Sequence, residues 1–137
     1  ANHYAVGPFC DIAGPSRVDL KNVLEGLDRV EVLGMLDRDE FFRRIRLLVH
    51  PARLEAFGMV VTEAMARGIP VLVSDATGAA SEVEDVHGRV LPLGAPMKEW
   101  TAAAKELLDQ DGCPEPYRRS WAEVADAYRA LYAQLAS

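Results

Sequence analysis

The sequence predicts an α/β fold, a parallel sheet sandwiched between helices. Two observations predict it: short apolar runs alternate with helical patterns along the 137 residues, and two of the runs, 47–49 and 71–74, are apolar enough for strands buried on both faces. Half of the residues are hydrophobic, which suffices for one core, so we expect a single domain over 1–137. Five candidate strands fit one doubly wound layer.

The first third of the chain mixes strands with a loop. Residues 4–6 are apolar and stop at a Gly-Pro pair, which is typical of a strand. A second Gly-Pro pair predicts a loop over 11–16. Apolar spacing predicts a helix over 18–27, and alternation that closes on glycine predicts a strand over 29–34.

A capping pattern marks the next helix, predicted over 37–46. Asp37 is a suitable N-cap, and Glu40 follows three residues later. The cap also explains the Asp-x-Asp spelling of residues 37–39, which otherwise resembles a metal motif. The buried face is expected to comprise Phe41, Phe42 and Ile45.

The rest of the chain continues the alternation of strands and helices. A helix over 58–67 is stopped by Gly68 and Pro70. The later elements are a strand over 71–74, a loop over 77–81, a strand over 89–91, and helices over 97–108 and 116–135. The last two helices carry Trp100 and Trp121, for which we expect core packing.

Composition excludes several classes of protein. A charged fraction of 26% does not suit a disordered or collagen-like chain. A net charge of −6 argues against a sequence-independent nucleic-acid partner, which needs a basic stripe. The two cysteines are far apart and match no metal or disulfide spacing, which favours a reducing compartment. No apolar run reaches the roughly 18 residues that a membrane span requires.

Ligand chemistry is expected in the loop over 50–58, which follows a buried strand and leads into a helix. The first turn of that helix carries no acid, so its free N–H groups suit an outside anion such as a diphosphate. Gly58 allows close approach to the backbone. Glu63 lies one to two turns along and can accept hydrogen bonds from the paired hydroxyls of a ribose. Solvent exposure alone explains Glu55 and Glu63 as well, so the residues by themselves leave both interpretations open.

The segment E-A-F-G-M-V-V-T-E-A-M-A-R-G-I-P-V-L-V-S resembles the donor-site signature of retaining GT-B glycosyltransferases. That signature is Glu, any residue, Phe-Gly, four residues, Glu-Ala, and then Gly-x-Pro-Val after a small-residue turn. Every fixed position is met from Glu55 to Val71. Four flanking segments resemble the family too: 32–36, 77–83, 88–91 and 120–132. The likeness therefore runs from about residue 29 to residue 135. The implied fold is the Rossmann-like C-terminal half of a GT-B enzyme.

The resemblance assigns a role to each part of this segment. Glu63 would bind the two ribose hydroxyls of a nucleotide sugar, and Glu55, the catalytic candidate, would contact the hydroxyls of the transferred sugar. Backbone N–H groups of four residues would bind the diphosphate and the sugar: Phe57, Gly58, Met59 and Val60. Three side chains would line the base: Met35, Leu36 and Arg53.

The resemblance also implies a reaction and its partners. The donor would be a UDP- or GDP-sugar, used with retention and with neither metal nor cofactor. The family's Gly-Arg-x-x-x-x-Lys-Gly segment and its N-terminal acceptor-binding domain would lie upstream of residue 4, so we expect the isolated chain to be inactive. Any membrane contact would be made by that absent half, and a cytoplasmic location, peripheral to the inner face of the membrane, is expected.

Two other functions remain open from the sequence. A sugar-nucleotide epimerase of the same fold would want further acids and histidines near the sugar. A non-enzymatic, flavodoxin-like regulatory domain would want an aspartate after the strand over 47–49, where His50-Pro51 stands instead. A dinucleotide oxidoreductase is excluded, because no G-x-G-x-x-G follows any predicted strand.

Overall fold

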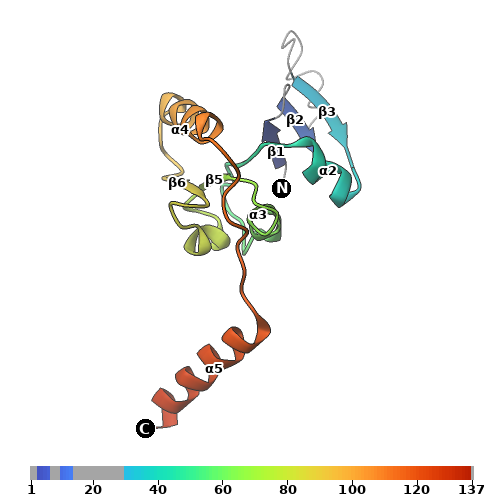
Figure 1. Ribbon diagram of the computed structural model, residues 1–137. Coiled ribbons are helices and arrows are strands. Elements are labelled where there is room, and N and C mark those ends of the chain that lie inside the picture. The colour runs from blue at the N-terminus through green and yellow to red at the C-terminus, as the bar shows by residue number, and fades with distance from the viewer. Residues whose placement is uncertain (1–2, 7–9, 14–29, 137) are drawn as a thin grey trace.

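The computed structural model describes residues 3–6, 10–13 and 30–136, and Figure 1 shows how their elements are arranged. The strands are β1 (His3–Val6), β2 (Cys10–Ala13), β3 (Val30–Gly34), β4 (Leu47–His50), β5 (Val71–Ser74) and β6 (Gly88–Leu91). The helices are α2 (Arg38–Arg44), α3 (Met59–Met65), the 3-10 helix η1 (Gly78–Glu82), α4 (Met97–Asp109) and α5 (Trp121–Ala136). The predicted α/β class is therefore confirmed.

The six strands form one sheet in the order β3-β2-β1-β4-β5-β6. Strands β4, β5 and β6 pair in parallel, as do β2 and β3. Strand β1 runs antiparallel to both of its neighbours, β2 and β4. All strands except β1 consequently point the same way, and their carboxyl ends lie at one edge of the sheet. That shared edge is where a doubly wound sheet binds ligands.

The loop predicted over 11–16 is wrong at its start, because residues 10–13 form β2. This strand has partners on both sides: Val6 pairs with Cys10 across the antiparallel ladder, and Cys10 pairs with Val30 across the parallel one. The Gly-Pro pair follows the strand and does not prevent it. The helix predicted over 18–27 lies outside the described residues.

Helix α2 begins as its capping pattern predicts. The Asp37 carboxylate accepts hydrogen bonds from the backbone N–H groups of Asp39 and Glu40, at 3.0 and 3.2 Å. These bonds satisfy two donors that have no partner within the helix. The helix ends at Arg44, because Ile45 adopts an extended conformation.

The central strands are buried on both faces, as their continuous apolar runs predict. On one face, Leu48 and Val71 join a cluster with the apolar sides of α2 and α3, including Phe41. On the other face, Leu47 and Leu72 pack against α4. Burial of a full-sized aliphatic side chain contributes about 1.5–3 kcal/mol, so this two-sided core fixes α3 and α4 on opposite faces of the sheet.

Helix α5 stands clear of the sheet in Figure 1 and has no buried residue. The side chain of Trp121 is 87% exposed, so the expectation that it packs in the core is wrong. Trp100 does pack partly against the core under α4, as expected. Among the described residues, no helix combines the length and the apolarity needed to cross a bilayer.

Candidate functional site

The candidate site lies at the sheet edge where β3, β4 and β5 end. The chain leaves β4 at His50 and reaches α3 through residues 51–58, and it leaves β5 at Ser74 and turns directly into η1. Residues 35–37 lie at the same edge after β3. The connections after β4 and β5 are neighbours in the sheet, and the segment after β3 reaches them through α2, where Arg38 contacts Glu63 of α3.

The loop that carries Glu55 is held in place by its backbone. The backbone N–H of Glu55 donates to the carbonyl of Ala76 at 3.2 Å, and the carbonyl of Glu55 accepts from the N–H of Gly78 at 3.0 Å. Two residues on, the carbonyl of Phe57 accepts from the N–H of Ala79 at 2.7 Å. The loop over 55–57 thus runs along the connection between β5 and η1 and is a fixed part of the site.

Three buried polar residues lie next to the loop over 51–58. His50, Ser74 and Thr77 are each at most 2% exposed. The Ser74 hydroxyl donates to the carbonyl of Ala52 at 2.5 Å and lies 3.3 Å from the hydroxyl of Thr77. Buried hydroxyls need such partners, and here the partners link the ends of β4 and β5 to the loop.

Burial lowers the pKa of His50, and the nearby Glu55 carboxylate opposes that effect in part. A desolvated imidazole is neutral because the charged form is the one that burial disfavours. His50 is thus a neutral, buried group beside the candidate catalytic carboxylate. This agrees with a structural role for His50.

The lowered pKa of His50 predicts a loss of stability in acid. Below the ordinary value of 6.5 the unfolded chain takes up a proton that the folded chain resists, so this contribution is full above pH 6.5 and is lost as pH falls. We expect His50→Gln to flatten the decline in unfolding midpoint between about pH 7.5 and pH 5. Thermal unfolding followed by circular dichroism measures both slopes. Identical slopes in the two proteins would contradict the prediction.

Gly58 opens α3 in the left-handed conformation, with φ +86°. A Cβ at this position would lie 3.0 Å from Thr77 Cγ2 and 3.1 Å from Glu55 Cγ. No side chain caps the helix, and its first turn has no acid, as the sequence predicts. Glycine therefore meets both the backbone angle and the tight space between Glu55 and Thr77.

Gly58→Ala is expected to destabilise the chain by about 2 kcal/mol, from the left-handed angle and the close contacts together. Gly112→Ala is the matched control: its φ is +89°, and nothing lies within 4 Å of its added Cβ. The control should lose only the conformational part, about 1 kcal/mol. Denaturant unfolding of both variants checks the difference. If both variants lose the same free energy of unfolding, the close contacts of Gly58 with Glu55 and Thr77 do not contribute to the cost of the substitution.

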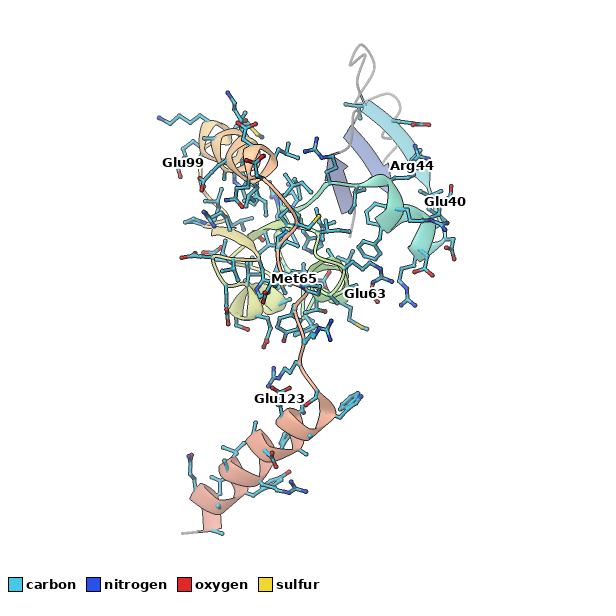
Figure 2. All side chains as sticks on the ribbon, in the orientation of Figure 1. Glu40, Arg44, Glu63, Met65, Glu99 and Glu123 are labelled. Carbon is cyan, nitrogen blue, oxygen red and sulfur yellow. The ribbon has the colours of Figure 1, made fainter. Side chains whose placement is uncertain are left out.

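Glu63 lies on the side of α3 that faces α2, and Figure 2 labels it there. Its side chain is 23% exposed, and its carboxylate accepts from Arg38 Nη1 at 2.9 Å. A second ion pair, Arg67 with Asp39 at 2.9 Å, also joins α3 to α2. The predicted ribose carboxylate is therefore partly buried, ionically paired, and close to the residues that follow β3.

The other predicted site residues fall into two groups. Four of them are exposed at this edge: Arg53, Phe57, Met59, which is 66% exposed, and Met35, which is 76% exposed. Two residues pack partly against the core, Leu36 and Val60. Packing of the Val60 side chain leaves its predicted role unaffected, because that role belongs to the backbone N–H. For Leu36, only part of the side chain remains available to contact a base. The ligand role of each stays a prediction.

Two contacts at the site are not predictable from the sequence: the Arg38–Glu63 ion pair and the hydrogen bond from Gly78 to Glu55. The sequence indicates only a capping role for residues 37–39, although Arg38 lies two residues beyond Leu36 of the predicted base loop. Gly78 belongs to the flanking segment 77–83, but nothing in the sequence indicates that its N–H donates to the carbonyl of Glu55. Both depend on contacts between elements distant in the chain.

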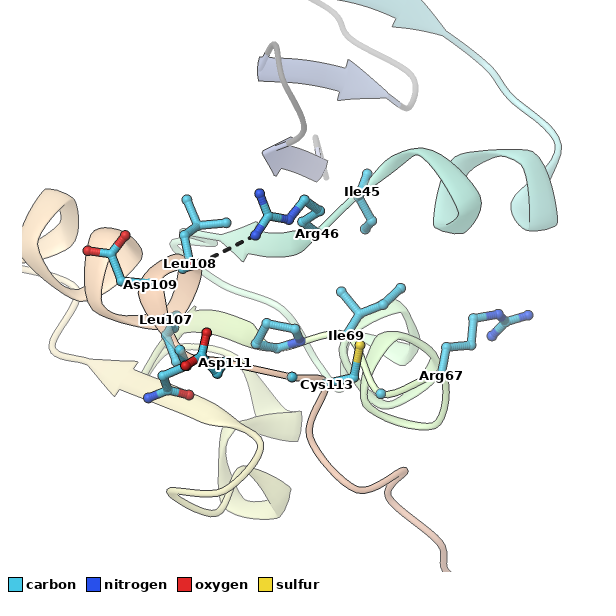
Figure 3. Close-up of a pocket in the computed structure, with 13 residues that line it drawn as sticks. Ile45, Arg46, Arg67, Ile69, Leu107, Leu108, Asp109, Asp111 and Cys113 are labelled. Carbon is cyan, nitrogen blue, oxygen red and sulfur yellow. Dashed lines mark hydrogen bonds between the residues drawn. The ribbon is translucent and has the colours of Figure 1, made fainter.

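A separate pocket of about 440 Å³ lies near the amino ends of β4 and β5 and is shown in Figure 3. It is lined by Ile45, Leu107 and Cys113 among others, and Arg46 there donates to the carbonyl of Leu108 at 3.5 Å. This is the edge of the sheet opposite to the candidate site. Among the described residues, no group of three or more His, Cys, Asp or Glu is arranged to hold a metal ion.

The chain is similar in sequence to known proteins. A profile of the family described as glycosyl transferases group 1 matches residues 6–110. The lipopolysaccharide glucosyltransferase WaaG of Escherichia coli is 33% identical over 96 residues, which are 69% of this chain and 25% of that protein. The D-inositol 3-phosphate glycosyltransferase of Mycolicibacterium smegmatis is 29% identical over 120 residues, 80% of this chain and 28% of that protein.

The fold is also similar to a solved structure. The crystal structure of WaaG, a glycosyltransferase involved in lipopolysaccharide biosynthesis, superposes with a TM-score of 0.63 and 25% identity. The match covers 73% of this chain and 29% of that one. The chain thus spans only a quarter to a third of the length of these relatives.

Proposed function

This chain belongs to the group 1 glycosyltransferases, and on that premise we propose that it is the donor-binding half of a GT-B enzyme. The full enzyme would transfer a sugar from a UDP- or GDP-sugar to an acceptor hydroxyl, with retention. The relatives described above are named as glycosyltransferases, which favours transfer over epimerisation or a regulatory role.

One observation carries the proposal: Glu63, in the second turn of the helix that follows β4, is partly buried and pairs with Arg38, the first residue of the helix that follows β3. Its carboxylate can accept hydrogen bonds from the two hydroxyls of a ribose. The base would then lie toward Met35 and Leu36. The diphosphate would lie toward the open first turn of α3, where Gly58 brings the backbone to the surface.

Catalysis would rest on stabilising the charge that develops on the departing nucleoside diphosphate. Backbone N–H groups of residues 57–60 are the donors available for that charge, so the proposed mechanism uses neither metal nor cofactor. Glu55 would contact the hydroxyls of the transferred sugar. The loop that carries Glu55 leads into α3 and is held by the hydrogen bond from Gly78 of η1 to the Glu55 carbonyl. The acceptor hydroxyl, held by the other half of the enzyme, would attack the anomeric carbon as the bond to the diphosphate breaks.

The proposal extends to the partners of the full enzyme. An N-terminal acceptor-binding domain and an upstream Arg/Lys segment would complete the cleft, so we expect no useful transfer rate from this chain alone. Cytoplasmic location, with membrane contact through that other domain, is part of the same proposal. Nucleic acid is not a proposed partner.

Calorimetric titration of UDP, GDP and ADP into this chain tests the proposal. We expect UDP or GDP to bind with a dissociation constant on the order of 0.1–1 mM, because in the proposed enzyme the other half would contribute to the site. Inorganic phosphate at the same concentration is the control and should not compete measurably. A folded chain that binds none of the three nucleotides would overturn the proposal.

A further inference from the structure

We propose that Arg38 is a positioning and specificity residue of the nucleotide site. It orients the Glu63 carboxylate and favours a base that presents carbonyl oxygens, such as uracil or guanine, over adenine. This inference rests on the proposed function, because it requires a nucleotide at Glu63.

Arg38 is well placed for this task. It is the first residue of α2, directly after the cap Asp37 and two residues beyond Leu36, which would line the base. Its Nη1 donates to Glu63 Oε1 at 2.9 Å. The Arg38 side chain is 65% exposed, against 23% for Glu63, so the guanidinium extends outward from the more buried carboxylate.

The fold does not depend on Arg38. Helix α2 is fixed to the core by Phe41 and Phe42, which are 6% and 5% exposed. A second ion pair, Arg67 with Asp39 at 2.9 Å, joins the same two helices. Since exposed ion pairs add little to stability, the stronger effect of Arg38 is expected on the geometry of the Glu63 carboxylate.

The chemistry of the guanidinium gives the base preference. Arginine has five N–H donors and no acceptor, and the Glu63 contact uses one nitrogen. Because Arg38 follows the predicted base loop by two residues, we expect its other donors to reach a base held there. Uracil and guanine present carbonyl oxygens that accept from them, whereas the amino group of adenine would place a donor against a donor.

The test is titration of UDP, GDP and ADP into wild type, Arg38→Ala, Arg38→Lys and Arg44→Ala. Arg44 is the matched control, because it is on the same helix and also pairs with a glutamate, Glu31, at 3.2 Å. We expect Arg38→Ala to weaken UDP or GDP binding about tenfold and ADP binding about threefold or less. Arg38→Lys should recover part of the affinity but not the preference between bases, and Arg44→Ala should match wild type.

Several outcomes would overturn the assignment. In one outcome, Arg38→Ala binds the nucleotides with the affinity of wild type. In another, the substitution weakens the binding of UDP, GDP and ADP equally, as the loss of a merely structural residue would. A wild-type preference for ADP would also contradict it. These results leave the proposed function intact, because wild type still binds. A wild type that binds no nucleotide would instead remove the proposed function and this inference together. Unfolding midpoints within about 3 °C of wild type establish that the variants are folded.

Discussion

Glu63→Ala is expected to lower the affinity for UDP or GDP about thirtyfold while the chain remains folded. The substitution removes the carboxylate that would accept hydrogen bonds from a ribose. One hydrogen bond to a charged group contributes about 1.5–3 kcal/mol, and thirtyfold corresponds to about 2 kcal/mol, the net loss of one such bond. Stability should change little, because the arginine of the ion pair that is lost, Arg38, has a side chain that is 65% exposed. Calorimetric titration and thermal unfolding of the same samples measure the two effects.

Glu106→Ala is the matched control for this prediction. Glu106 is also a helical glutamate paired with an arginine, Arg89, at 2.6 Å, but it lies on α4. Its loss should leave nucleotide affinity within about twofold of wild type. If Glu63→Ala and Glu106→Ala bind nucleotide equally well, Glu63 does not hold the ribose and the assignment is wrong.

Gly78→Ala is expected to destabilise the chain by about 3 kcal/mol. The added Cβ would lie 2.1 Å from the carbonyl oxygen of Ala56 and 2.9 Å from Phe57 Cα. Both contacts are with backbone, so relief requires the loop over 55–57 to move away from η1. The same shift would displace Glu55 and the first turn of α3, and nucleotide affinity should fall with stability.

Gly94→Ala is the control for crowding at Gly78. Nothing lies within 4 Å of its added Cβ, and its backbone angle is not left-handed. It should change the free energy of unfolding by less than about 1 kcal/mol. Urea unfolding compares the two variants. If Gly78→Ala is as stable as Gly94→Ala, the loop over 55–57 is not held against η1 as described.

Local patterns predicted the elements whose determinants are local. The Asp37 cap, the helix after Gly58 and the strands over 47–49 and 71–74 all appear close to their predicted positions. A cap and an apolar period act within a few residues, so the sequence shows them directly. The loop over 50–58, where we predict ligand chemistry, likewise lies at the carboxyl edge of the sheet.

Features that depend on distant partners were not predictable in this way. Residues 10–13 form a strand because β1 and β3 pair with them, and no local period indicates this. The reversal of β1 is likewise a property of the assembled sheet. Trp121 belongs to an apolar helix face, but such a face does not show whether another element covers it. The Arg38–Glu63 pair and the contact of Gly78 with Ala56 join segments that only tertiary structure brings together.

The most direct test of the central claim is to map nucleotide binding by NMR on isotope-labelled chain. Addition of UDP or GDP should shift, in a saturable way, the amide signals of residues 57–60, Glu63 and Met35. That result would place the ligand at the carboxyl edge of the sheet, between α3 and the loop after β3. Saturable shifts confined to the pocket lined by Ile45, Leu107 and Cys113 would contradict it, because that pocket lies at the opposite edge.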